Sequence, residues 1–262
     1  MGIDRRGFIR IAGLTAFGAM SNSVFDHAVA SEEITEEGLV AASLKAHRWA
    51  MVIDIKKCQE QHGCTKCIDA CHTVHNVPDY ENPKDEIKWI WHETYEHTFH
   101  EQEHEHLPEH LRHLPVLVLC NHCDNPPCVR VCPTKATFQR NDGIVAMDMH
   151  RCIGCRYCVA ACPYGSRSFN WREPKRWFEE NDVDINKSFP TRTRGVVEKC
   201  NFCAERLVKG QIPACVEACE ANAMFFGDLD DPDSEVREIL SSRFSIRRKP
   251  NLGTLPQIYY LL

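Results

Sequence analysis

The chain contains two cysteine-rich stretches close together, CNHCDNPPCVRVCP at residues 120–133 and CIGCRYCVAACP at residues 152–163. The first spaces its cysteines as C-x2-C-x4-C-x3-C and the second as C-x2-C-x2-C-x3-C. In both, the fourth cysteine is followed directly by proline. So many regularly spaced thiols within about forty residues indicate a metal-binding region.

The spacing of the second run is that of the bacterial ferredoxin ligands, and the first run differs by two additional residues in one gap. In such runs three closely spaced thiolates reach one face of a cubic iron–sulfur cluster. The fourth thiolate, which lies beyond a short turn, reaches a different cluster. The runs therefore predict two 4Fe–4S clusters that share their ligands crosswise. Structural zinc and disulfide bonds are the alternatives, although zinc usually takes two C-x2–4-C pairs.

The remaining cysteines form two further runs of four. Residues 58–71 read C-x5-C-x2-C-x3-C, and residues 200–219 read C-x2-C-x11-C-x3-C. All sixteen cysteines are thereby divided into four runs with none left over. In the first run His72 replaces the proline and His75 follows closely, so a zinc or mixed Cys/His site is the alternative there.

Length and composition limit the possible functions. The chain has 262 residues, of which 43% are hydrophobic and 26% charged, as expected of a globular protein. Its formal net charge of −6 argues against a nucleic-acid partner. After the N-terminal segment, no stretch of 18 apolar residues is present, so we expect membrane association only through other subunits.

Residues 1–30 are typical of a twin-arginine export signal. Arg5 and Arg6 precede large apolar residues, a short glycine-containing apolar run spans residues 11–20, and Ala28-Val29-Ala30 matches a cleavage site. A short membrane anchor or an amphipathic helix is the alternative. Twin-arginine export carries folded proteins, and a cluster protein needs that route because its cofactor is inserted where thiols stay reduced. We therefore expect a periplasmic protein.

The segments between the runs contain expected strands, helices and two inserts. Strands are expected at residues 50–55, 87–91, 115–119, 223–227 and 257–261, a hairpin around Asp142-Gly143, a short helix at 204–208 and a helix starting at Ser234. Residues 92–113, with seven histidines and six glutamates, are interpreted as a solvated helix with Phe99 and Leu107 facing inward, or else as a metal-binding or docking surface. The basic, aromatic segment 163–199 is either a docking patch for an acidic partner or an ordinary surface.

Taken together, the four runs resemble the four-cluster iron–sulfur subunits of membrane-associated oxidoreductases, such as those of dimethyl sulfoxide, polysulfide and nitrite reductases. The resemblance extends from about residue 50 to the C-terminal segments 227–234 and 252–260. More narrowly, residues 67–78, the segment Lys88–Trp91 and the leader are similar to the DsrO-type periplasmic iron–sulfur subunits of the DsrMKJOP complex in sulfur-metabolising prokaryotes.

The resemblance implies the ligands of each cluster. They are Cys58, Cys64, Cys67 and Cys219 for one; Cys200, Cys203, Cys215 and Cys71 for a second; Cys120, Cys123, Cys128 and Cys162 for a third; and Cys152, Cys155, Cys158 and Cys132 for the fourth. The x5 gap after Cys58 departs from the usual spacing of the family and puts the geometry of the first cluster in doubt.

The expected fold is α+β, with two intertwined ferredoxin-like units that bind four 4Fe–4S clusters. The outer unit is expected at residues 50–75 and 196–230, the inner unit at 115–165, inserts at 76–114 and 166–195, and a C-terminal helix and tail at 231–262, all within one domain at 31–262 after the leader. We expect one-electron transfer without a substrate-converting site. The resemblance implies an NrfD-type (DsrP-like) membrane subunit, a periplasmic multihaem cytochrome c (DsrJ-like) and other Dsr subunits as partners. A zinc-stapled structural protein and a subunit of a molybdopterin reductase are the alternative functions.

Overall fold

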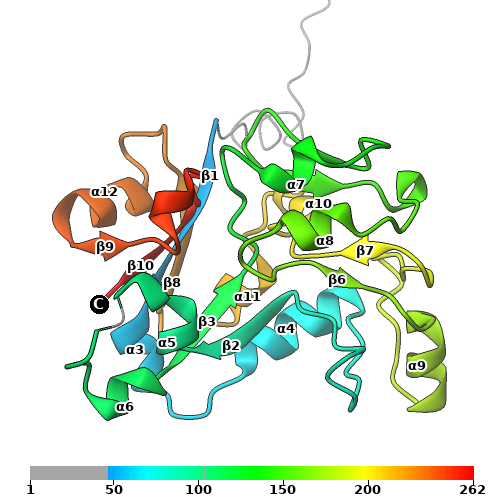
Figure 1. Ribbon diagram of the computed structural model, residues 1–262, viewed down its shortest axis with the longest axis horizontal. Coiled ribbons are helices and arrows are strands. Elements are labelled where there is room, and N and C mark those ends of the chain that lie inside the picture. The colour runs from blue at the N-terminus through cyan, green and yellow to red at the C-terminus, as the bar shows by residue number, and fades with distance from the viewer. Residues whose placement is uncertain (1–46, 103) are drawn as a thin grey trace, which may run out of the picture. The chain divides into compact units, whose positions relative to one another are not determined.

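The computed structural model describes residues 47–102 and 104–262, so the leader at residues 1–30 lies outside the described residues. The strands are β1 (Trp49–Asp54), β2 (Ile90–Thr94), β3 (Pro115–Leu119), β4 (Thr137–Gln139), β5 (Val145–Met147), β6 (Ser168–Phe169), β7 (Val197–Glu198), β8 (Met224–Asp228), β9 (Ser245–Ile246) and β10 (Ile258–Leu261). The mixture of short strands and short helices fits the expected α+β class (Figure 1).

The helices are short, and several of them carry cysteines. They are α3 (Ile55–Gln59), α4 (Lys66–His75), α5 (Tyr95–Thr98), α6 (Glu109–Arg112), α7 (Pro127–Arg130), α8 (Tyr157–Ala161), α9 (Pro174–Glu180), α10 (Ala204–Leu207), α11 (Ala214–Glu217) and α12 (Glu235–Ser242), with 3-10 turns η2 (His100–Gln102), η3 (Met149–Arg151) and η4 (Pro250–Leu252). No helix among the described residues is long and apolar enough to cross a membrane.

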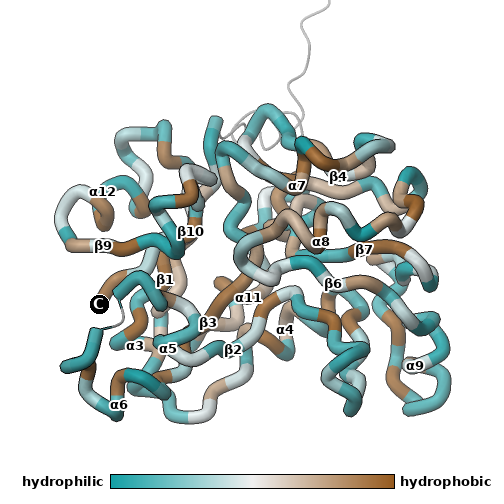
Figure 2. Tube along the Cα trace, viewed as in Figure 1, coloured by the Kyte–Doolittle hydropathy of each residue, from teal (hydrophilic) through white to brown (hydrophobic). Residues whose placement is uncertain are grey.

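A four-stranded sheet with the order β8-β1-β10-β9 joins the two ends of the described chain. Strand β1 runs antiparallel to β8 and parallel to β10, so Val52 lies opposite both Phe225 and Tyr259. Residues 50–53 are almost fully buried. An unbroken apolar run such as Ala50–Ile53 is what a strand covered on both faces requires. In Figure 2 the hydrophobic colour follows β1 and β3 into the interior, while hydrophilic residues occupy the outer turns.

Strand β1 leads directly into the first cysteine-bearing helix. Asp54 ends the strand, and its Oδ1 accepts a hydrogen bond from the Lys57 backbone N–H at 3.1 Å, which caps α3. The same buried carboxylate pairs with Arg243 at 2.8 Å. The buried strand and this cap thereby fix the position of α3, which carries Cys58.

Helix α12 packs its apolar side on this sheet, as expected from the sequence. Val236 is fully buried against β1 and β10, and Ile239 and Leu240 pack beside it. Ser234 does occupy the N-cap position, but its side chain makes no capping hydrogen bond. Its Oγ is buried directly over Gly227, where an added Cβ would lie only 2.6 Å away. Close packing on the sheet has displaced the expected cap.

The expected hairpin between the two central runs is confirmed. Strands β4 and β5 are antiparallel, with Phe138 opposite Ala146. Gly143 has a φ of 81°, a left-handed conformation that glycine adopts without strain, and the Arg140 N–H donates to the Ile144 carbonyl. The hairpin therefore closes over the cysteines on either side of it.

The interpretation of residues 92–113 as one solvated helix is wrong. Strand β2 continues to Thr94 because it pairs with β3 along its whole length, from Ile90 opposite Leu119 to Thr94 opposite Pro115. Only short turns of helix follow, at α5, η2 and α6. Phe99 is buried as expected, whereas Leu107 is only half-buried. Pairing with a distant strand has overridden the local helical preference.

A fully buried ion pair ties the second insert to the end of α4. Arg192 Nη2 lies 2.6 Å from Glu198 Oε2, and neither side chain is exposed. Glu198 also accepts from Trp89 Nε1 and from Asn170 Nδ2, each at 2.6 Å. Arg192 donates in addition to the backbone carbonyls of His75 and Asn76, where α4 ends. Both charges are thereby hydrogen-bonded on several sides, which offsets the cost of burying them.

We expect Arg192→Met to lower the stability of the holoprotein by about 3–5 kcal/mol, because it leaves the Glu198 carboxylate buried without its cation. This corresponds to a fall of roughly 10 °C in the melting temperature, measured by thermal unfolding. Arg176→Met is the matched control, since Arg176 pairs with Glu180 on the exposed surface of α9, and should cost less than about 0.5 kcal/mol. If the double variant Arg192→Met/Glu198→Leu is no more stable than Arg192→Met alone, the unpaired charge is not the cause.

Candidate iron–sulfur site

The cysteines gather in four sets, and one of them lines a single cavity. Set D consists of Cys132, Cys152, Cys155 and Cys158, all of which line the same cavity together with Thr137, Met147 and Val197. Three of these cysteines come from the run at residues 152–162, whereas Cys132 comes from the preceding run. Cys155 is exposed, and Cys132 and Cys152 are half-buried.

A second set lies deeper in the protein. Set C consists of Cys120, Cys123, Cys128 and Cys162. Burial and the neighbouring thiols of the set together raise the pKa of Cys123 to about 12. The pKa of Cys162 is raised by burial and by Cys120, which is the first cysteine of the other run. The first three members of set C are buried and Cys162 is half-buried.

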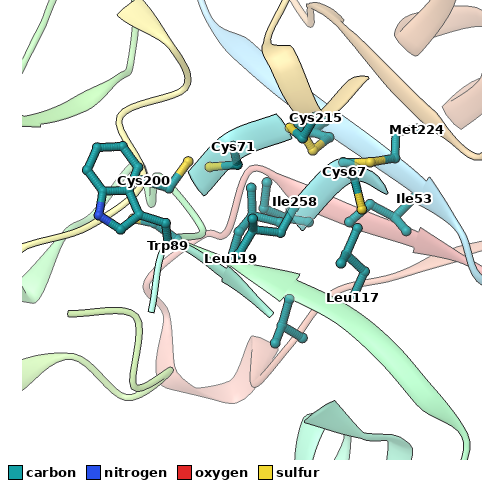
Figure 3. Close-up of a cluster of buried hydrophobic side chains, with 14 of the residues drawn as sticks. Ile53, Cys67, Cys71, Trp89, Leu117, Leu119, Cys200, Cys215, Met224 and Ile258 are labelled. Carbon is teal, nitrogen blue, oxygen red and sulfur yellow. The ribbon is translucent and has the colours of Figure 1, made fainter. Parts of the chain in front are cut away.

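The third set is entirely buried. Set B consists of Cys71, Cys200, Cys203 and Cys215. Burial raises the pKa of Cys71 well above that of an ordinary thiol, and Cys200, Cys215 and Cys203 raise it further. Figure 3 shows Cys71, Cys200 and Cys215 on three different segments within a hydrophobic core that includes Leu119 and Ile258.

The fourth set is close to the surface. Set A consists of Cys58, Cys64, Cys67 and Cys219. Burial raises the pKa of Cys67 to about 12, with contributions from the other three thiols. The pKa of Cys58 is raised by burial and by Cys219, which comes from the last of the four runs. Cys58, Cys64 and Cys219 are half-buried, and Cys67 is buried.

Neighbouring thiols also connect the four sets to one another in a definite order. Besides burial, the charge of Cys67 in set A raises the pKa of both Cys71 and Cys215 in set B. Burial and the charge of Cys120 in set C raise the pKa of Cys200 in set B. Burial and the charge of Cys128 in set C raise the pKa of Cys158 in set D. From these pairs we infer the order A, B, C, D. Set B and three of the four thiols of set C are buried, whereas sets A and D are partly exposed.

These four groups are the ligand sets that the family resemblance implies, and their role as iron ligands stays a prediction. All sixteen cysteines lie within the described residues and are free thiols, with no disulfide among them. Four soft thiolate donors in each group suit a 4Fe–4S cluster, and a set of four cysteines also suits zinc. Metal binding requires thiolates, so the buried sets need a bound cation to stabilise charges that burial alone disfavours.

The loops that hold the cysteines contain backbone conformations that L-residues rarely adopt. His122, Arg156, Phe202 and Cys203 have φ values between 40° and 63°, and each lies within or next to a C-x2-C segment. Such a residue costs of order 1–2 kcal/mol. Strain of this kind is typical of functional sites, where the surrounding structure holds it in place.

Backbone N–H groups point at the sulfurs in these loops. Phe202 N donates to Cys200 Sγ at 3.4 Å and Ala214 N to Cys203 Sγ at 3.4 Å. Burial acts to raise the pKa of Cys132, but N–H donors led by Thr137 lower it below the usual thiol value. Hydrogen bonds of this kind stabilise a thiolate and raise the potential of a cluster that it holds.

His75 lies beside the last cysteine of the first run, with its Nδ1 3.6 Å from Cys71 Sγ, so the mixed Cys/His alternative for that run stays a prediction. It belongs to the surroundings of set B, because its ligand atom lies within 4.8 Å of those of Cys203 and Glu205. Its Nε2 is 2.8 Å from Glu205 Oε1. Burial opposes its charge, but Cys203 and Glu205 raise its pKa to about 9.

Lys199 is a further residue at the site that the sequence pattern did not single out. It is buried, and its Nζ donates to the backbone carbonyls of Val145 and Cys200. Burial dominates and raises the pKa of Cys200, while the charge of Lys199 acts in the opposite direction. In the sequence, Lys199 is marked only by its place directly before Cys200. Its burial depends on the tertiary fold.

Comparison with known proteins supports the same kind of site. Residues 113–177 and 182–229 match a family described as a 4Fe-4S dicluster domain. The chain is 37% identical over 278 aligned residues to the Hdr-like menaquinol oxidoreductase iron-sulfur subunit 1 of Archaeoglobus fulgidus, covering 98% of this chain and 97% of that protein.

Two further relatives cover 82% of this chain. The menaquinone reductase iron-sulfur cluster-binding subunit of Nitratidesulfovibrio vulgaris is 38% identical, with 88% of its length covered. The arsenate respiratory reductase iron-sulfur subunit of a Shewanella species is 36% identical, with 96% covered. The identity and coverage show that this protein belongs to the family of 4Fe-4S iron–sulfur subunits of electron-transferring oxidoreductase complexes.

Proposed function

We propose that the chain carries single electrons through four 4Fe–4S clusters, held by sets A, B, C and D, between a quinone-interacting membrane subunit and other redox partners. The observation that carries this proposal is the unbroken order of the four sets, with buried thiols in the middle and partly exposed thiols at both ends. A bound cluster supplies reversible one-electron chemistry at a potential that the protein adjusts.

The chain's own residues bind and shield such clusters. In each set three thiolates come from one run and the fourth comes from another run, so the two outer runs are held together, as are the two inner ones. The core around set B, which includes Ile258, Trp89 and Phe202, excludes water from the middle of the path. The exposed Cys155 and the half-buried Cys58 leave both ends accessible to other subunits.

Four clusters require about sixteen iron atoms and as many acid-labile sulfides per chain. Iron, zinc and sulfide analysis of the anaerobically purified protein should give these amounts. Fewer than about twelve irons contradict four complete clusters, and zinc in their place favours the structural alternative.

We expect Cys162→Ser and Cys128→Ser to alter the same EPR signal of the reduced protein, because both residues belong to set C. Cys132→Ser and Cys158→Ser should alter a second signal, that of set D. Sorting the variants by the EPR signal that each one alters needs no prior assignment of signals to clusters. If Cys162→Ser instead alters the same signal as Cys158→Ser, its neighbour in sequence, the crosswise ligation is wrong.

We infer further that the complex is of the Dsr type, with an NrfD-type (DsrP-like) membrane subunit and a multihaem cytochrome c (DsrJ-like). The resemblance of residues 67–78, Lys88–Trp91 and the leader supports this choice, and the match to a menaquinol oxidoreductase subunit of Archaeoglobus fulgidus supports a quinone-linked complex. The second candidate is a subunit of a molybdopterin reductase. It is favoured by the similarity to a component of the polysulfide reductase of Wolinella succinogenes, which is 33% identical, and to one of the tetrathionate reductase of Salmonella typhimurium, which is 39% identical. Purification of the tagged subunit from native membranes separates the two, since recovery with a molybdopterin subunit and no haem contradicts the first.

We also propose export by the twin-arginine route to the outer face of the cytoplasmic membrane, on the basis of residues 1–30. The variant Arg5→Lys/Arg6→Lys should accumulate with its clusters in the cytoplasm, as measured by cell fractionation and immunoblotting. Lys56→Arg, a conservative change at an exposed position in α3, is the control and should be exported normally. Unchanged export of the twin-lysine variant would falsify this route.

A further inference from the structure

Arg167 is a buried cation that lies between two of the thiol sets. It follows Pro163 in the chain and directly precedes β6, and its side chain is only 4% exposed. Cys128, on α7 in set C, and Cys158, on α8 in set D, pack in one buried cluster. The charges of both thiols act on the pKa of Arg167, so this single cation is within electrostatic range of two neighbouring sets.

The position of the guanidinium is fixed by the hairpin beside it. Arg167 Nη1 donates to Thr137 Oγ1 at 3.1 Å and lies 3.8 Å from Met147 Sδ. Thr137 is on β4 and is 1% exposed, and Met147 is on β5. These contacts come from the β4–β5 hairpin, which separates the two inner cysteine runs in sequence.

The charge of Arg167 is compensated chiefly by sulfur. Burial acts to lower the pKa of Arg167, but the thiolates of Cys128, Cys158 and Cys120 raise it. Nη2 is buried and has no hydrogen-bond partner among the described residues. A buried charged donor without a partner is costly, and negative charge on a cluster bound in the neighbouring sets would offset that cost.

Thr137 and Met147, which hold Nη1, also line the cavity of set D. We propose that the buried positive charge of Arg167 raises the reduction potentials of the clusters in sets C and D. This inference rests on the proposed function. Reduction adds one electron, and thus one negative charge, to a cluster, while no bond is made or broken. A fixed positive charge in a poorly screened interior stabilises the reduced form. Because the same charge acts on both sets, it shifts the two potentials in the same direction, so that C and D both become easier to reduce.

The test is an EPR-monitored redox titration of the purified holoprotein, with signals assigned by the cysteine variants described above. Arg167→Gln retains an N–H donor and removes the charge, and Arg167→Met removes both. We expect both variants to make reduction of clusters C and D less favourable by at least tenfold, equivalent to about 59 mV for a one-electron couple. Arg167→Lys should recover most of this shift, and Thr137→Val should produce a smaller shift in the same direction.

Lys199→Gln is the matched control, because Lys199 is also a buried cation but lies beside Cys200. It should shift the signal of set B and leave that of set D unchanged. Iron and sulfide contents are measured for every variant, so that cluster loss is distinguished from a change in potential.

Unshifted potentials of C and D in fully loaded Arg167→Gln would overturn the role of Arg167 and leave the proposed function standing. A purely structural role predicts the same cluster loss in Arg167→Lys as in Arg167→Met, with unchanged potentials in the clusters that remain. A wild-type protein without iron would instead overturn the proposed function and this inference with it.

Discussion

The gathering of sixteen thiols into four groups, with nine of the thiols buried, is the constraint on which this structure depends. Metal ligation requires thiolates, yet burial and mutual repulsion disfavour them, as the pKa values of about 12 for Cys67 and Cys123 indicate. Such groups are stable only with a bound cation, or with every thiol protonated. Much of the fold can be understood as a means of holding these groups together, including the strained loops around His122 and Phe202 and the N–H donors that point at sulfur.

The long-range contacts of the chain serve the same purpose. Strand β1 pairs with β8 and β10, which brings Cys58 beside Cys219, although the two lie near opposite ends of the described sequence. The buried pair of Arg192 and Glu198 then anchors the end of α4, which carries Cys67 and Cys71. Sets of cysteines from distant runs and a sheet with strands from distant segments thus reinforce each other.

Buried positive charge is distributed unevenly along the path. Lys199 and His75 lie at set B, and Arg167 lies between sets C and D. Each lies where its hydrogen bonds and charge would change the relative stability of the oxidised and reduced states of a cluster bound by the neighbouring set. The partly exposed sets A and D are, in contrast, the places where solvent and partner subunits have access.

Cysteine spacing indicated four groups of soft ligands, and the pattern of apolar residues located β1, β3, the β4–β5 hairpin, β8, α12 and β10 to within a few residues. Apolar periodicity and turn residues within one segment are sufficient to predict each of these elements, although the partner of each strand lies elsewhere in the chain. Residues 92–94, in contrast, became a strand because β3 lies beside them, and Ser234 lost its capping bond because it packs on Gly227. His75 lies beside Cys71 of the first run, as expected from the sequence, but also beside Glu205 and Cys203 of the last run, which only the tertiary structure brings near it. The order of the four sets and the burial of Arg167 between two of them follow from how distant segments meet, and no spacing within one segment specifies that.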